Sequence, residues 1–284
     1  MLKQRDELVG RGFGNLSPTD LAALGAIQWR LRDSDSALTT LKQAAGRDPR
    51  NFWVLTHLGS VHQALGQYRE GSSPLESARD FFPDPWPVGP PAAGDWFKKA
   101  EGYQLKLLRL RLPENSFRTS GRPMPAADVD RLFGVRFVGP SGQYEAGKLA
   151  DAERTKLPAD AVAVVQQLLL WFPDDTRLLW LLGELYNAQG DLEAASKILD
   201  DCVWQRRYDS PALREHRQIV QEAYEAQVKA ATPPPQEPPK PVILPGTWQV
   251  YAVGIGFGLV LAVLAYFQVG QLLRRLRRPV PPST

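Results

Sequence analysis

The sequence predicts an all-α fold: a solenoid of stacked helical hairpins, with a small irregular, β-containing insertion and one transmembrane helix near the C-terminus. Three observations support this prediction. Two stretches match each other at a spacing of 34 residues, and large apolar residues within them recur three and four positions apart. These two features indicate helices that pack along one side. The third is the absence of charged residues from Thr247 to Leu273, which indicates a membrane span.

The spacing of 34 residues defines two helical hairpins in residues 18–85, after an N-terminal segment of residues 1–17. Residues at equivalent positions are alike: Leu21 and Leu55, Leu24 and Leu58, Gly25 and Gly59, Ala37 and Gly71, Leu41 and Leu75, Ala44 and Ala78, Pro49 and Pro83. Ser17 followed by Pro18 is typical of a helix start. Gly25 and Gly59 lie mid-helix, where glycine costs about 1 kcal/mol relative to alanine. We therefore predict that another helix crosses closely at each glycine.

The same pattern returns in residues 161–230, which we predict to hold a further hairpin region and a capping helix. The matching positions are Leu179, Leu182, Gly183, Tyr186, Gly190, Ala195 and Leu199. Upstream, Ala161, Val165, Leu168 and Pro173 fit the second half of another hairpin. Ser210-Pro211 begins a helix with a polar outer face, as the end of a stack of hairpins requires.

A helical hairpin of 34 residues with these positions resembles the tetratricopeptide repeat. The resemblance covers the two N-terminal hairpins and the later one. It implies pairs of antiparallel helices that share a core, and a concave surface that holds another protein. It does not identify that protein.

Residues 86–160 interrupt the pattern and are predicted to be a helix plus an irregular insertion. The run PDPWPVGPP (83–91) ends the preceding helix, because proline lacks a backbone donor and clashes with the previous turn. A helix is expected from about Asp95 to Leu112, and FGVRFVG (133–139) is expected to form a short strand.

One motif in the insertion resembles a phosphate-binding loop. GQYEAGKL (142–149) has the spacing of such a loop, but Leu149 stands where a Ser or Thr would bind magnesium, and Glu145 would bring negative charge to the phosphate. A turn explains its glycines equally well. Nucleotide-binding or enzymatic chemistry in residues 113–160 therefore remains an alternative function.

No other pattern indicates catalysis or a cofactor. His57 and His62 are five positions apart and do not share the helical face that metal ligands use, and Cys202 fits a core position. No nucleophile, base and orienting group are brought together by the sequence. We expect no catalytic residue, no metal and no cofactor, so the chain is not expected to be an enzyme.

The C-terminal part is predicted to anchor the chain in a membrane. Residues 231–246 are a proline-rich linker, residues 247–273 a transmembrane helix, and residues 274–284 a basic tail. The tail residues expected to meet anionic lipid are Arg274, Arg275, Arg277 and Arg278. Gly254 and Gly258 are four apart and form a candidate membrane and dimer face, so a homodimer is a further structural alternative.

The side of the membrane on which the repeats lie stays open. Arginines directly after the span favour a cytoplasmic C-terminus and exported repeats. The N-terminus MLKQRDELVGRGFG has no apolar signal core, which favours cytoplasmic repeats unless a signal segment lies upstream. Residues 1–246 carry 30 basic and 31 acidic side chains, so no nucleic-acid partner is expected.

The resemblance also implies which residues would line a binding groove, because first-helix residues face the concave side of such repeats. The predicted partner-binding residues are Trp29, Arg30, Trp53, Thr56, Gln63, Arg177, Trp180 and Asn187. Tryptophan and arginine are frequent among residues that dominate interfaces. The alternative is that the three tryptophans pack against the insertion or another repeat.

Taken with the span, these features predict a non-catalytic, membrane-tethered adaptor that binds an unidentified protein or peptide through its groove. Family members that clamp a terminal carboxylate use lysine and asparagine at groove positions. This chain has Ala22, Ala26, Thr56 and Ser60 there, so a partner with apolar contacts is expected instead.

Overall fold

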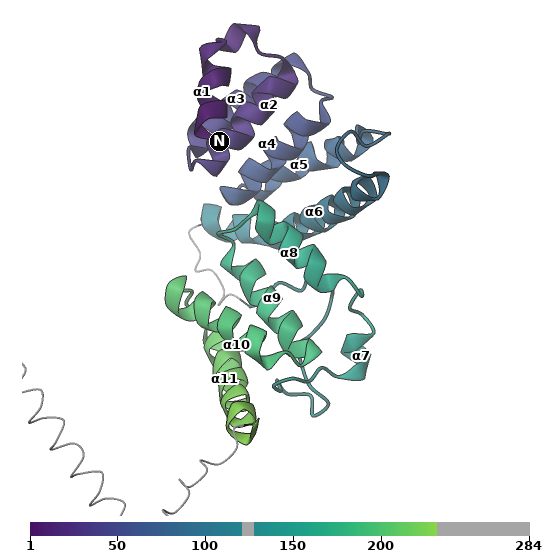
Figure 1. The fold of residues 1–284 in the computed structure, drawn as a ribbon, viewed down its shortest axis with the longest axis vertical. Coiled ribbons are helices and arrows are strands. Elements are labelled where there is room, and N and C mark those ends of the chain that lie inside the picture. Colours follow the sequence, from purple (N-terminus) through teal and green to yellow (C-terminus); the bar gives the residue numbers. More distant parts are fainter. Residues whose placement is uncertain (121–127, 232–284) are drawn as a thin grey trace, which may run out of the picture. The chain divides into compact units, whose positions relative to one another are not determined.

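The computed structural model describes residues 1–120 and 128–231, with side chains for all of these except residues 115–120. Residues Met1–Ala230 form one compact unit. Figure 1 shows its helices, which are α1 (Leu2–Gly10), the 3-10 turn η1 (Phe13–Asn15), α2 (Pro18–Arg30), α3 (Ser34–Arg47), α4 (Phe52–Ala64), α5 (Tyr68–Asp80), α6 (Pro91–Ser120), α7 (Asp151–Arg154), α8 (Ala161–Trp171), α9 (Thr176–Gln189), α10 (Leu192–Asp200), the π-helical turn η2 (Asp201–Gln205) and α11 (Pro211–Ala231). The all-α prediction is confirmed.

Side chains cap the first helix of each hairpin. Ser17 Oγ accepts a hydrogen bond of 3.0 Å from the backbone N–H of Asp20, and the Asp20 carboxylate accepts one of 3.2 Å from the N–H of Ser17. Asn51 caps α4 and Asp175 caps α9 through their side-chain oxygens. These bonds satisfy N–H groups that have no partner within the helix, which fixes where each hairpin begins.

Glycines bring the two helices of each hairpin into close contact, as predicted. A Cβ atom added to Gly25 of α2 would lie 2.6 Å from Cγ of Leu41 on α3. Gly59 of α4 meets Leu75 of α5 in the same way, and a Cβ on Gly183 of α9 would lie 2.9 Å from Leu199 on α10. Three hairpins thus repeat one packing arrangement.

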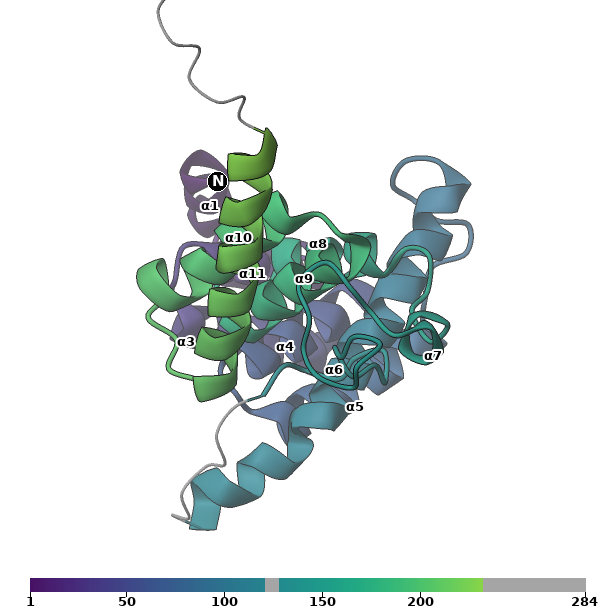
Figure 2. The same cartoon turned by 90° about the horizontal axis from the view of Figure 1, so that it is seen from below.

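The hairpins are joined through α6, which contacts both α5 and α8. An N-terminal core contains buried residues of α1 to α4, such as Leu21, Leu24, Leu41 and Val54. A second, larger core joins α8, α9 and α10 to the segment that follows α6, and Trp180 lies fully buried in it. Helix α11 packs against α9 and α10 and closes this core (Figure 2).

The β-containing insertion was predicted wrongly. Residues 133–139 form no strand, and none occurs in the part of the chain that the structure describes. Val135 and Phe137 are buried while Arg136 between them is exposed, because this extended segment lays one side on α9. That alternation resembles a strand, but the backbone hydrogen bonds of Ala150 to Val138 and of Gly139 to Gln143 are isolated and do not form the ladder that a strand requires.

The transmembrane part of the predicted fold class and the predicted membrane localisation are corrected. Across residues 1–120 and 128–231, no helix has both the length and the apolar character that a bilayer span requires. The residues predicted to span, 247–273, lie outside the described part of the chain, as do the linker 231–246 beyond Ala231 and the tail 274–284.

Candidate functional site

Two adjoining hollows lie beside the first two hairpins and share Trp29. The smaller, here called the aromatic hollow, has a volume of about 140 Å³. Its aromatic lining residues are Trp29, Phe52, Trp53, Trp86, Phe97 and Trp171, and its polar ones are Arg30, Thr56, His57, Ser60, Glu101 and Gln104. The larger, here called the polar cavity, has a volume of about 610 Å³ and extends to α9.

A continuous row of rings forms one wall of the aromatic hollow. The ring centroids of Trp53 and Trp86 are 5.4 Å apart, Trp86 stacks on Phe97 at 5.2 Å, and Phe97 stacks on Trp171 at 6.1 Å. These residues come from α4, the loop before α6, α6 itself and α8. The four rings are partly buried, so each retains surface that a bound group can cover.

The loop between α5 and α6 places Trp86 at the centre of this wall. A Cβ on Gly94, in the first turns of α6, would lie 2.8 Å from Cβ of Trp86, so only glycine leaves room for the tryptophan. Trp86 also stacks on Phe82 at 5.1 Å. The proline-rich run that ends the second hairpin therefore folds back over the hollow.

Burial removes charge from two titratable groups in the aromatic hollow. Burial raises the pKa of Glu101 to about 8, although Arg79 on α5 opposes this shift. Burial, with the positive charge of Arg30, lowers the pKa of His57 to about 4. Both side chains are therefore mostly uncharged near neutral pH. Arg30 is exposed. Among the described residues that line the hollow, it is the one that keeps its charge near neutral pH.

Ion pairs fill one side of the polar cavity. Arg111 of α6 donates to Asp130 at 2.5 Å and to Asp175 at 2.6 Å, and its side chain is only 6% exposed. Arg177 of α9 donates to Asp130 at 2.5 Å and pairs with Glu114. Burial opposes the charged form of Arg111, but Asp175 and Asp130 outweigh it and raise its pKa. These pairs join α6, the insertion and α9.

The structure brings six of the predicted groove residues to the two hollows. Trp29, Arg30, Trp53 and Thr56 line the aromatic hollow. Trp29 also lines the polar cavity, together with Gln63 and Arg177. The Thr56 hydroxyl donates to the carbonyl oxygen of Trp53 at 3.2 Å, and Gln63 accepts a hydrogen bond of 3.1 Å from Gln104 of α6.

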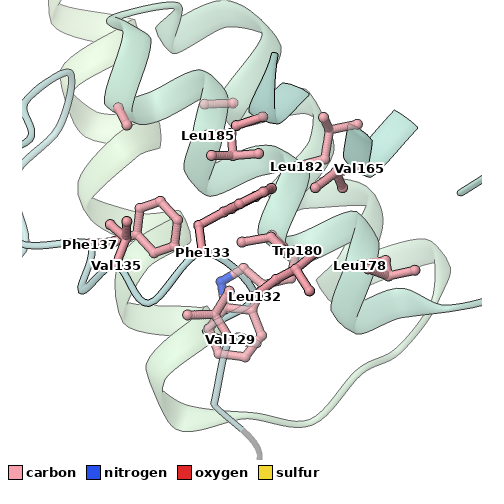
Figure 3. Packing of buried hydrophobic residues seen from close by; sticks show 14 of the residues in the cluster. Val129, Leu132, Phe133, Val135, Phe137, Val165, Leu178, Trp180, Leu182 and Leu185 are labelled. Atoms are coloured by element: carbon pink, nitrogen blue, oxygen red, sulfur yellow. The ribbon is translucent and has the colours of Figure 1, made fainter. Parts of the chain in front are cut away.

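The prediction that Trp180 and Asn187 line the binding groove is corrected, because these residues line neither hollow. Trp180 is fully buried, and its indole N–H donates to Glu184 at 2.6 Å. The Asn187 side chain accepts from the N–H of Gly147 at 2.7 Å and donates to the carbonyl oxygen of Glu145 at 3.2 Å. The insertion thus covers this face of α9, with apolar residues of 129–137 packed around Trp180 (Figure 3).

The lining residues missed from the sequence include Trp86, Phe97, Glu101 and Trp171. Phe97 and Glu101 are four positions apart on α6 and share a face, which is a signal that periodicity would have detected. Trp86 lies in a run whose prolines marked only a break between helices. Trp171 ends α8, and nothing local connects it with hairpins more than 100 residues earlier.

The backbone of the loop-like motif 142–149 is already engaged within the chain. The N–H of Gly147 donates to Asn187, and the Glu145 carboxylate accepts from the N–H of Ser141 at 3.0 Å and from Lys148 at 3.1 Å. Hydrogen bonds from Ser141 and Lys148 lower the pKa of Glu145 to about 2. An ionised carboxylate therefore stands beside the lysine that would bind phosphate.

Gly254, Gly258 and the arginines at 274, 275, 277 and 278 lie outside the described residues.

Residues 156–203 match a family model described as the tetratricopeptide repeat. The match contains α8, α9 and α10, so the helical hairpin that follows the insertion carries this repeat in sequence as well as in shape. No curated protein matches the chain.

Proposed function

We propose that this chain is a non-catalytic protein-interaction adaptor, and that a peptide segment of its partner binds in the aromatic hollow and the adjoining polar cavity. The tetratricopeptide repeat and the helical fold support an interaction role. The observation that carries the proposal is the wall of partly buried rings from Trp53 to Trp171, which faces an open hollow.

The energetics of such a wall favour binding. Burial of one large apolar side chain contributes about 1.5–3 kcal/mol, and tryptophans at the centre of an interface commonly contribute more than their neighbours. Trp86 stacks on both Phe82 and Phe97, and Phe97 stacks on both Trp86 and Trp171, so these rings already cover much of one another's faces. The apolar surface that the four partly buried rings of the wall still expose lines one hollow, and apolar surface gathered in this way is typical of an interaction site.

The location of the site follows from what already covers α9. In many repeats of this kind all first helices face the same groove, but here the insertion and α11 occupy the face of α9 that carries Trp180 and Asn187. The first helices of the two N-terminal hairpins, α2 and α4, keep exposed or partly buried side chains at Trp29, Arg30 and Trp53. The partner is therefore assigned to these hairpins.

A peptide library tests this proposal. The full chain is immobilised, random displayed peptides are selected, and the dissociation constants of the enriched peptides are measured by fluorescence anisotropy. Trp53→Ala should weaken them at least about tenfold, since the loss of a central tryptophan costs about 2 kcal/mol.

The matched control is Trp204→Ala. Trp204 is 62% exposed on η2 and lines neither hollow, so its loss should leave the affinities unchanged. If Trp53→Ala unfolds the chain, Arg30→Ala replaces it, because Arg30 is exposed and its removal leaves no cavity. Failure to enrich any peptide, or equal effects of the two tryptophan variants, would contradict the proposal.

A further inference from the structure

We infer that the aromatic hollow selects partner peptides in which a large apolar side chain is flanked by an acidic residue. The apolar side chain fills the hollow, and the acidic residue pairs with Arg30 at its margin. This inference rests on the proposed function and adds to it the chemistry that the partner must carry.

The dimensions and walls of the hollow fix the first requirement. The hollow is small, with a volume of about 140 Å³ beside about 610 Å³ for the polar cavity, so we assign it one inserted side chain of the partner. The stacked rings of Trp86, Phe97 and Trp171 present apolar surface to whatever enters. An aromatic or long aliphatic side chain gains the most from this environment, because it removes the largest apolar area from water.

The charges around the hollow fix the second requirement. Glu101 and His57, which lie among the rings, are mostly uncharged near neutral pH for the reasons given above. Arg30 is exposed and, among the described residues, has no carboxylate within ion-pair distance. Arg30 is itself one of the residues that line the hollow. The hollow therefore carries a positive margin that complements an acidic group.

Rings of this kind can also bind a cation on their π faces, so a basic partner has to be weighed. Two features oppose it here. Arg30 would repel a cation at the margin, and Glu101, the carboxyl group among the residues that line the hollow, would have to ionise in a buried site before it attracted one. The combination favours the acidic partner.

A dependence on pH follows from Glu101. Arg79 on α5 is the charged group that acts on Glu101, and His57 on α4, Arg30 on α2 and the uncharged Gln104 on its own helix line the same hollow. The protonated form of Glu101 is present below pH 8, and a bound apolar side chain stabilises that form by removing water. Affinity for the acidic peptide should be full below pH 8 and fall as the pH rises above it.

Three synthetic peptides of equal length test the inference against the full chain by fluorescence anisotropy. One carries aspartates on both sides of a tryptophan, one carries lysines on both sides of it, and one carries the aspartates around an alanine. The aspartate–tryptophan peptide should bind most tightly. Replacement of its aspartates by lysines, or of its tryptophan by alanine, should weaken binding at least about tenfold. Arg30→Glu should reverse the preference between the two tryptophan peptides, whereas Arg69→Glu, an exposed charge that lines neither hollow, should not.

The pH dependence is checked in the same assay. Glu101→Gln should abolish the loss of affinity above pH 8, because glutamine does not ionise. Tighter binding of the lysine peptide to the wild-type chain, or an unchanged preference in Arg30→Glu, would overturn the inference. Enriched library peptides that depend on Trp53 but lack the acidic–apolar pattern would overturn it and leave the proposed function standing. Absence of any enriched peptide would instead defeat the proposed function.

Discussion

Glu184 has no solvent exposure, and polar neighbours meet one of its two carboxylate oxygens, whereas the other oxygen has no hydrogen-bond partner among the described residues. The indole N–H of Trp180 donates to one carboxylate oxygen at 2.6 Å, and Nδ1 of His216 lies 2.7 Å from the same oxygen. Tyr144 stacks on the His216 ring with centroids 3.6 Å apart, and burial together with Glu184 raises the pKa of Tyr144. One residue therefore joins α9, α11 and the insertion.

Replacement of His216 by alanine should destabilise the chain, because it removes a polar partner from a buried carboxylate. We expect the free energy of unfolding to fall by about 2 kcal/mol, measured by urea denaturation. Arg214→Ala is the control, since this exposed residue of α11 pairs only with an exposed aspartate and should change stability by about 0.5 kcal/mol or less. Equal effects of the two variants would show that Glu184 does not depend on His216.

At the scale of single elements, the hairpins depend on contacts between a glycine and a leucine. Gly25 meets Leu41, Gly59 meets Leu75 and Gly183 meets Leu199 at equivalent positions. Glycine lowers the stability of a helix. Its presence at each crossing therefore means that the close packing of the two helices adds more free energy of folding than the glycine removes.

Gly25→Ala should therefore destabilise the chain even though alanine is the better helix former. The new Cβ would lie 2.6 Å from Leu41, and overpacking of this kind costs about 1–3 kcal/mol. Gly102→Ala is the matched control: it lies within α6 with no atom within 4 Å of the new Cβ, so it should stabilise by up to about 1 kcal/mol. Thermal denaturation of both variants shows whether each is stabilised or destabilised relative to the wild-type chain. A stabilised Gly25→Ala variant would refute the packing argument.

The helices were predictable because the information that forms them is local. The caps at Ser17 and Asn51 and the apolar periodicity lie within one turn or one hairpin of the structure they specify. The segment 133–139 was not predictable on the same basis. Its alternation of buried Val135 and Phe137 with exposed Arg136 comes from packing on α9, and an alternating pattern does not tell a strand from an extended segment without a partner strand.

The candidate site was predictable in part. Trp29, Arg30 and Trp53 lie on first helices, where the repeat pattern alone assigns the exposed face. Trp180 occupies the position on α9 that Thr56 occupies on α4, but it is buried, because a distant segment of the chain covers it. Trp86 and Trp171 join the hollow only through tertiary packing, which no local pattern reports.

At the scale of the whole Met1–Ala230 unit, two faces that the repeat pattern makes equivalent have different roles. The face of α9 is used internally, where the insertion and α11 bury Trp180 and Glu184 and the Arg111–Asp130 pair ties α6 to the insertion. The faces of α2 and α4 remain open and border the aromatic hollow. The central claim is that the partner occupies this second face.

The most direct test is photo-cross-linking of a selected peptide that carries a photoreactive group at its apolar anchor position. The peptide is bound to the full chain and irradiated, and mass spectrometry identifies the modified residues. The account predicts adducts around the aromatic hollow, on α2, α4, the loop that carries Trp86, α6 or α8. Adducts confined to α9, α10 and α11 would contradict it, because they would place the partner on the face that the chain itself covers.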